Sequence, residues 1–416
     1  MQNSFSGDLV FRLSLAIVLT GVVAVLLMPV VSELLCVLVS WRRVRPGKAK
    51  AELPRLLFLV PAHNEELLIT KCVRSLLALA YPASHRRVVV IADNCTDSTA
   101  RLAREEGAET LERSDPAAPG KPRALAWAIA QIELGDWDAC VIVDADSTVA
   151  PTFALGLGEL APLNDIIFQP NNWVLNEFEN WLTRLGGLLG RNRFYVTYPL
   201  KQSAGLNCPI SNGMGFGTKL LMRDGWRSFS ITEDTELYAV YTAEGVRIRH
   251  APAANLFSQE AHSLPQGAIQ RRRWIAGRVH IIREWGPRLL RSKKIGWRQK
   301  LDALVELALP APVLHLLVTG ATIAAALVGV RGKPGWWIAA AAAASLSGIV
   351  VTTIAAMWNH PQPWRTLASF FMLPVYAVWR VLVVVKTVVT VRDTTWQRTG
   401  RTGSIGGTVA VQDRPA

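Results

Sequence analysis

The apolar run from Leu9 to Leu38 limits what this chain can fold into more than any other feature. It contains only two charged residues, Arg12 and Glu33, and it is longer than the roughly 20 residues with which a helix crosses a bilayer. It is also too long for the apolar part of a secretory signal, and no small-residue cleavage pattern follows it. The sequence therefore predicts a membrane-spanning helix near the amino terminus.

Basic residues predict how this helix is oriented. They follow it throughout residues 42–50, whereas no Lys or Arg precedes Val10. Because cytosolic flanks of membrane helices are rich in Lys and Arg, we expect the amino terminus outside and the polar middle of the chain in the cytosol.

Three further apolar stretches lie near the carboxyl terminus, at about 301–330, 336–358 and 367–391. Three full crossings would place the Arg-rich tail outside, against the charge rule. One stretch is therefore expected to be interfacial or re-entrant, and 301–330 and 367–391 both remain candidates. The segment RLLRSKKIGWRQK (288–300) mixes apolar and basic residues, which suits a helix on the cytosolic membrane surface.

Composition excludes several other classes of protein. Half of the 416 residues are hydrophobic, and the net charge is +13. The basic residues gather beside the apolar segments, which favours contact with anionic lipid, and no nucleic-acid partner is expected. The five cysteines are scattered without a CxxC pair, so neither a disulfide framework nor a thiolate metal site is predicted.

The polar middle of the chain has the pattern of an α/β domain. Short apolar runs at 55–62, 87–94 and 139–146 end at polar residues, as buried parallel strands do. Segments with helical spacing alternate with them, which predicts crossover units and a doubly wound, mainly parallel sheet. Ligands of such sheets gather at the carboxyl ends of the strands.

Acidic residues stand at two of these strand ends. Asp93 ends the second strand, where it either belongs to the cap of the next helix or grips the base or ribose of a nucleotide. Asp144 and Asp146 end the third. Two neighbouring carboxylates repel each other unless a cation lies near them, and Mg²⁺ or Mn²⁺ accepts oxygen ligands while sharing its shell with substrate phosphates. We therefore predict a divalent metal here.

Two later segments each allow two interpretations. SITEDTEL places Asp234 in the first turn of a predicted helix, where it either stabilises the helix terminus or acts as a general base. In QGAIQRRRWIAGRVH, helical spacing puts Gln270, Arg273 and Trp274 within one turn. That turn is either a basic membrane-facing patch or a clamp, with arginine for a phosphate and tryptophan for a sugar.

Taken in order, the motifs resemble those of membrane-embedded family 2 glycosyltransferases, a group that includes cellulose, hyaluronan, chitooligosaccharide and poly-N-acetylglucosamine synthases and ceramide glucosyltransferase. The resemblance covers about residues 55–280. It implies a GT-A fold, a UDP-sugar donor, inversion at the anomeric carbon, and Mg²⁺ or Mn²⁺ as cofactor. The matching motifs are VPAHNEE (60–66), IADNCTD (91–97), GKPRALAWA (120–128), DADS (144–147), TED (232–234) and QRRRW (270–274).

The resemblance also implies roles for individual residues. Asp234 would deprotonate the acceptor, Asp146 would bind the metal, and Trp274 would present a flat face to the acceptor. The other positions would hold the UDP-sugar: Pro61, Ala62 and Glu65 around the uridine, Asp93 at the base, Lys121 near the nucleotide, Asp144 facing UDP, and Gln270 and Arg273 at the diphosphate.

Three features lie outside the common pattern or extend it. Asn94 stands where many relatives have a second Asp, so no role is assigned to it. The glycine-rich segment 212–217 replaces the usual acceptor loop and is either an approach to the acceptor or a structural turn. The segment WQRTGR (396–401) resembles a W-x-[KR]-T-x-R element of relatives and is expected in the cytosol.

The predicted function is that of a membrane-bound glycosyltransferase in polysaccharide synthesis. A single-addition lipid glycosyltransferase is the alternative. A third possibility is an inactive nucleotide-sugar-binding protein, which is disfavoured because Asp144, Asp146 and Asp234 are all present. Expected partners are the UDP-sugar, a saccharide or lipid acceptor, membrane lipids, and export or accessory subunits. We expect an integral protein of a bacterial inner or plasma membrane. Its expected parts are a membrane helix with a basic flank (1–50), a cytosolic GT-A domain (51–285), an interfacial helix (286–300), membrane segments (301–392) and a cytosolic tail (393–416).

Overall fold

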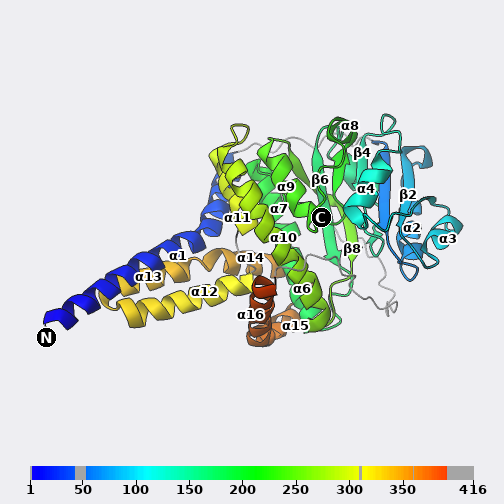
Figure 1. Ribbon diagram of the computed structural model, residues 1–416. Helices are drawn as coiled ribbons and strands as arrows, with labels where there is room; N and C mark the ends of the chain where they lie inside the picture. Colours follow the sequence, from blue (N-terminus) through cyan, green and yellow to red (C-terminus); the bar gives the residue numbers. More distant parts are fainter. Residues whose placement is uncertain (1, 43–52, 309–311, 359, 391–416) are drawn as a thin grey trace.

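The computed structural model describes residues 2–42, 53–308, 312–358 and 360–390. An α/β domain occupies one end of the molecule, and long apolar helices project away from it (Figure 1). The described strands form one mixed sheet in the order β3-β2-β1-β4-β7-β6-β8-β5. Their bounds are β1 (Leu56–Ala62), β2 (Arg86–Asp93), β3 (Glu109–Arg113), β4 (Ala139–Ile142), β5 (Thr148–Val149), β6 (Ile167–Val174), β7 (Gly215–Gly217) and β8 (Ile248–Ser258).

The strands expected from the sequence are confirmed as β1, β2 and β4, which pair in parallel. Successive side chains of a strand point to opposite faces, so Phe58 packs in one core with Ile69, and Leu59 packs in another with Leu125. Helices therefore cover both faces of the sheet. They include α2 (Ile69–Leu77), α3 (Thr99–Glu105), α4 (Lys121–Ile129), α5 (Phe153–Gly158), α8 (Thr218–Asp224) and α9 (Glu233–Ala243).

The second half of the sheet departs from the parallel pattern. Strand β7 pairs antiparallel with both β4 and β6, within the glycine-rich segment 212–217. A Cβ atom on Gly215 would lie 2.0 Å from the ring of Phe168, so only glycine lets this strand fit against its neighbour. Packing in the sheet thus accounts for the glycine at this position, as the structural interpretation of the segment expected.

Four helical segments are long and apolar enough to cross a membrane: Asp8–Ser40, Pro312–Val330, Gly332–Met357 and Pro363–Thr387. The first is α1 (Gln2–Arg42), which confirms the expected helix. The other helices and turns are α12 (Pro312–Ala325), η3 (Ala326–Val330), α13 (Gly332–Ala344), α14 (Ser347–Met357), α15 (Pro363–Ala368), η4 (Ser369–Met372) and α16 (Leu373–Thr390).

Two expectations about these segments are corrected. The stretch 301–330 is not one span, because α11 (Trp297–Ala308) packs on the α/β domain and the apolar span begins only at Pro312. The segment 286–300 is not one helix either. Helix α10 (Leu264–Arg291) continues into it and ends, a loop follows, and α11 begins at Trp297. The loop before α11 contains Gly296, and glycine disfavours the helical conformation.

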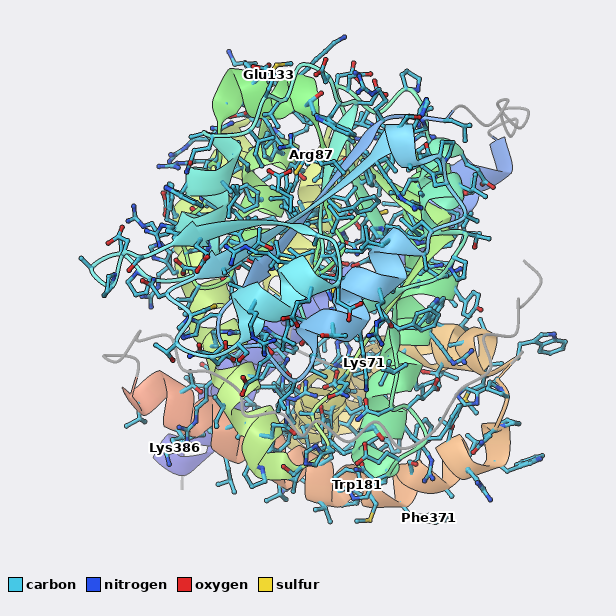
Figure 2. The ribbon with its side chains drawn as sticks, turned by 90° about the vertical axis from the view of Figure 1, so that its right-hand side faces the viewer. Lys71, Arg87, Glu133, Trp181, Phe371 and Lys386 are labelled. Atoms are coloured by element: carbon cyan, nitrogen blue, oxygen red, sulfur yellow. The ribbon has the colours of Figure 1, made fainter. Side chains whose placement is uncertain are left out.

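Exposed aromatic side chains lie at the end of the molecule away from the sheet. Phe371 is at that end, opposite Glu133, and so is the partly buried Trp181 of α6 (Trp181–Arg191) (Figure 2). Phe371 is 85% exposed and Trp364 is 80% exposed. Exposed aromatic residues on apolar helices are typical of a bilayer or of its interface, so this end is the one that suits lipid.

A buried ion cluster joins α1 to the α/β domain. Lys201, on α7 (Tyr198–Ala204), lies 3.1 Å from Asp302 and 2.6 Å from Glu306, both on α11. Asp302 also accepts a hydrogen bond from Ser32 of α1, at 3.1 Å. Burial alone would lower the pKa of Lys201, but the two carboxylates outweigh it and raise that pKa. The lysine is therefore charged where these three helices meet.

Replacing Lys201 by methionine should destabilise the protein by roughly 3–5 kcal/mol, because two buried carboxylates would lose their cation. Thermal unfolding of the detergent-purified protein measures this effect. Lys219→Met on α8 is the matched control, since that lysine is exposed. Equal unfolding midpoints for the two variants would contradict the importance of the cluster.

Candidate active site

The loops after β1 and β2 are held together by side chains and backbone. Nδ1 of His63 lies 2.7 Å from the carbonyl oxygen of Asp93. The backbone N–H of Glu65 donates to the hydroxyl of Thr99 at 2.7 Å, and the backbone N–H of Thr96 donates to the side-chain oxygen of Asn64 at 2.8 Å. These contacts bring the predicted uridine-binding residues Pro61, Ala62 and Glu65 next to the predicted base-binding residue Asp93.

Asp93 is buried, and each oxygen of its carboxylate has a partner in the protein. One carboxylate oxygen lies 2.6 Å from a guanidinium nitrogen of Arg113, and the other accepts a hydrogen bond from the backbone N–H of Gly120 at 3.2 Å. Gly120 has a φ of 113° and directly precedes α4. Asp93 thus positions the start of α4, and with it Lys121. Asp93 is therefore not the cap of α3. Near the start of that helix, a carboxylate oxygen of Asp97 accepts a hydrogen bond from the backbone N–H of Thr99.

Lys121 joins two of the predicted motifs. Its ammonium nitrogen lies 2.8 Å from Asp144 and 3.0 Å from Glu233. Burial alone would lower the pKa of Lys121, but the charges of these two carboxylates outweigh burial and raise it. The end of the DxD strand and the start of α9 are therefore drawn to one cation, although they lie about ninety residues apart in the sequence.

Asn212 holds the backbone and side chains of the DxD segment. Its side-chain oxygen accepts from the backbone N–H of Asp144 at 3.0 Å, and its side-chain nitrogen donates to the hydroxyl of Ser147 at 2.7 Å. Ser147 in turn donates to a carboxylate oxygen of Asp146 at 3.0 Å. The geometry of both aspartates is therefore set by one residue of the glycine-rich segment.

The aspartates of this segment fit a divalent cation. Among the described residues, no group of three or more His, Cys, Asp or Glu side chains is placed to bind a metal. Magnesium and manganese need only one or two carboxylates when substrate phosphates and water complete the shell. Asp144 and Asp146 supply oxygen ligands of this kind, so the predicted site is chemically suitable for a metal that arrives with a nucleotide diphosphate.

Asp234 lies beside this charged group, at the start of α9. Burial raises the pKa of Asp234, and the adjacent negative charge of Glu233 raises it further, to about 6. The backbone N–H of Thr235 donates to one oxygen of Asp234 at 2.6 Å. A carboxylate with its pKa close to neutral can accept a proton and later release it, as a general base must.

Helix α10 packs directly on the segment that carries Asp234. Figure 1 shows α9 and α10 side by side. A Cβ atom on Gly277 would lie 2.2 Å from the hydroxyl oxygen of Thr232. Gly277 is one helical turn beyond Arg273 and two beyond Gln270, so all three share one side of the helix. The absence of a side chain at 277 lets that side approach Thr232.

Several polar atoms of the QRRRW turn are buried without a protein partner among the described residues. They are Oε1 of Gln270 and Nε of Arg271, Arg272 and Arg273. An unpaired buried donor or acceptor costs about 1–3 kcal/mol, so such a group indicates a ligand. Trp274 is 41% exposed, which leaves its ring available.

Arg271 has a different environment from the one that lipid phosphates would provide. It is buried, it forms an ion pair with Glu260 at 3.2 Å, and its guanidinium lies 5.6–5.9 Å from the ring centres of Trp274, Tyr376 and Trp379. The last two rings belong to α16. Arg271 therefore fastens α16 to α10, through cation–π contacts and an ion pair.

The structure thus brings the predicted site residues into one continuous series of contacts, from β1 through Asp93, Lys121 and Asp144 to Asp234 and α10. Sequence reasoning missed Arg113 and Gly277, and it gave Asn212 and Glu233 no separate role. Arg113 ends a strand that was not predicted. Glu233 was visible beside Asp234, but its ion pair with Lys121 depends on the fold. The tail segment 396–401 and basic residues 43–50 lie outside the described residues.

A curled mixed sheet covered by helices, with acidic residues at the strand ends, defines a GT-A glycosyltransferase. The family model described as "Glycosyltransferase like family 2" matches residues 54–277. The match covers more than half of the chain, and the chain belongs to this family.

Named relatives agree with this assignment. The probable glycosyltransferase YdaM of Bacillus subtilis is 24% identical over 258 residues, which are 58% of this chain and 60% of that protein. A beta-monoglucosyldiacylglycerol synthase of Trichormus variabilis is 26% identical over 298 residues, which are 68% of this chain and 61% of that protein. The chain therefore spans about 60% of the length of these two relatives.

A solved structure shares the fold over most of both chains. The mannosyltransferase PcManGT of Pyrobaculum calidifontis, in complex with GDP-Man and Mn²⁺, aligns with a TM-score of 0.55 and 19% identity. The alignment covers 91% of this chain and 96% of that one. Its extent beyond the family match shows that the helices after α10 also have counterparts there.

Gly277→Ala should weaken the contact between α10 and the segment that carries Asp234, because the new methyl group would overlap Thr232. We expect a lower unfolding midpoint and, since Asp234 would be displaced, a reduction of glycosyl transfer of about 10²-fold. Gly286→Ala on the same helix is the control, because a Cβ atom there meets nothing within 4 Å. Identical behaviour of the two variants would show that this contact does not position the site.

Proposed function

We propose that this protein transfers a sugar, with inversion, from a UDP-sugar to an acceptor that approaches from the membrane. The observation that carries the proposal is the bridge formed by Lys121 between Asp144 and Glu233. This bridge supports the proposal because a displacement between a diphosphate and an acceptor hydroxyl needs the metal-binding segment and the base close together.

The donor would lie across the carboxyl ends of β1, β2 and β4. Pro61, Ala62 and Glu65 would line the uridine, and Asp93 would contact the base from its position beside Arg113. Asp144, held by Lys121, would face the UDP. These assignments follow the motifs and are supported by the contacts that join the loops.

The leaving group would be stabilised from two sides. Asp146 would bind Mg²⁺ or Mn²⁺, which supplies positive charge to the diphosphate when it is bound. On the other side, Gln270 and Arg273 would reach the diphosphate with polar groups that have no hydrogen-bond partner among the residues that the structure describes. Arginine suits this task because its guanidinium pairs with phosphate oxygens in a fixed geometry.

Asp234 would act as the base. As the acceptor oxygen bonds to the anomeric carbon, the bond from that carbon to the diphosphate breaks, and the hydroxyl proton passes to the Asp234 carboxylate. A single displacement of this kind inverts the anomeric centre. Trp274, with its exposed ring, would present an apolar face to the acceptor.

A membrane lipid is the acceptor that we favour. The charged cluster of α7 and α11 connects the domain to α1 close to the site, and relatives include proteins named as glucosyldiacylglycerol synthases. Chain growth on a polysaccharide, with export or accessory subunits, is the second candidate, because the Gln270–Trp274 motif resembles that of polysaccharide synthases. Either way, we propose a cytosolic catalytic domain at a bacterial plasma membrane.

The direct test incubates the vesicle-reconstituted protein with radiolabelled UDP- and GDP-sugars and separates lipid-extractable from polymeric products. We expect label from a UDP-sugar in the lipid fraction. Asp234→Asn should lower the rate about 10²–10⁴-fold while UDP binding is retained. For the wild type, kcat/KM should fall as the pH drops below about 6, because protonated Asp234 cannot accept the hydroxyl proton.

Each part of this experiment can fail separately. Label only in polymer would favour the polysaccharide alternative, and transfer only from GDP-sugars would contradict the UDP assignment. An Asp234→Asn variant with wild-type turnover would remove the base from its role. Asp224→Asn, on α8 and away from the site, controls for loss of an acidic residue.

Removal of divalent metal should stop transfer, because the diphosphate would lose the cation that balances its charge. Activity after EDTA treatment should return with Mg²⁺ or Mn²⁺. Asp146→Asn should raise the metal concentration needed for half-maximal activity at least about tenfold, while Asp136→Asn, on an exposed loop, should not. Full turnover in the presence of EDTA would contradict a metal role for Asp146.

A further inference from the structure

Helix α10 presents two neighbouring stripes of polar residues. Gln270, Arg273 and Gly277 form the stripe that faces Thr232 and the proposed diphosphate site. Arg271, Trp274 and Arg278 recur at the same helical spacing and form the next stripe, which faces α16. The second stripe has no proposed role in binding the donor.

Arg380 of α16 faces this second stripe, and no described residue forms an ion pair with it. The side chain is 6% exposed, and its Nε and one Nη atom have no hydrogen-bond partner among the described residues. It lies close enough to interact electrostatically with Arg271 and Arg278. Burial of one arginine against two others is costly unless an anion compensates it. An ionisable residue within an apolar helix marks a functional site by default.

The neighbouring charges do not neutralise Arg380. Arg271 is already paired with Glu260. Glu306, the carboxylate near Arg278, lies 2.6 Å from Lys201. Among the described residues, no carboxylate lies within 4 Å of Arg380, so the position that faces its guanidinium suits an anion.

The same arginines extend toward the proposed base. Arg278 interacts electrostatically with both Arg380 and Asp234. Arg193, exposed on the π-helical turn η2 (Asn192–Thr197), also interacts with Asp234. An anion near Arg380 and Arg278 would therefore lie on the membrane side of Asp234, next to Trp274, and not on the donor side of α10.

We propose that Arg380, with Arg278, binds the phosphate of an acceptor lipid whose headgroup carries a free hydroxyl as well as a phosphate diester. This inference rests on the proposed function. The phosphate would be held between α10 and α16, and the hydroxyl of the same headgroup would reach Asp234. Its oxygen then bonds to the anomeric carbon, its proton passes to Asp234, and UDP leaves. A base is needed because the attacking group is a hydroxyl and not the phosphate itself.

The test compares Arg380→Gln with the wild type, using phosphatidylglycerol as probe. Native mass spectrometry of the detergent-purified protein should show that the wild type retains this lipid and that the variant does not. In vesicles, the apparent KM for phosphatidylglycerol should rise roughly tenfold, the loss expected for one charge-assisted contact. The KM for the UDP-sugar should stay unchanged. Arg380→Lys should restore part of the affinity.

Arg365→Gln is the matched control, since that arginine is exposed on the neighbouring α15. Diacylglycerol, which lacks the phosphate, should be a poorer acceptor, and its use should not depend on Arg380. Glycerophosphoglycerol, the same headgroup without acyl chains, distinguishes a lipid from a soluble phosphate ester. Transfer to it at the same KM would assign the anion site to soluble esters.

Equal retention of phosphatidylglycerol by the wild type and Arg380→Gln would overturn the proposal. A preference for diacylglycerol over phosphatidylglycerol that is the same in the wild type and in Arg380→Gln would also overturn it. If no UDP-sugar is transferred to any acceptor, the proposed function fails. The lipid-retention measurement would still report on Arg380 in that case. If Arg380→Gln does not fold, Arg380→Lys and Arg278→Gln provide the same comparison.

Discussion

The ammonium group of Lys121 is the interaction on which the rest of the site depends. Asp144 and Glu233 come from separate parts of the chain, and each would repel the other without a cation between them. The lysine can hold both because Asp93 fixes the start of α4 through the Gly120 N–H. The positive charge of Lys121 therefore holds the end of the DxD strand and the start of α9 together.

Helix α10 connects this charged centre to the apolar helices. One stripe of the helix packs against the segment of the base through Gly277, and the next is fastened to α16 by Arg271. The cluster around Lys201 makes a second connection, to α1. Asp234 therefore lies between two links to the apolar helices, and this position is the reason for proposing an acceptor that approaches from their side.

Much of this arrangement could be predicted from the sequence, because local pattern determines it. Apolar runs that end at polar residues predicted β1, β2 and β4, and they placed Asp93 and Asp144 at one edge of the sheet. Contacts between distant segments could not be predicted. Arg113 lies on a short strand without an apolar pattern. That Arg380 has no ion-pair partner within the described part of the chain depends on the packing of α16 against α10, which spacing in one helix does not determine.

A structure of the protein with UDP and Mn²⁺ bound would test the central claim most directly. We expect the cation to lie between Asp146 and the diphosphate, and Arg273 to form a hydrogen bond with the β-phosphate. We also expect Asp234 to face the side from which the acceptor would approach. A diphosphate bound elsewhere, with Lys121 still bridging Asp144 and Glu233 and the QRRRW turn far from it, would contradict the account.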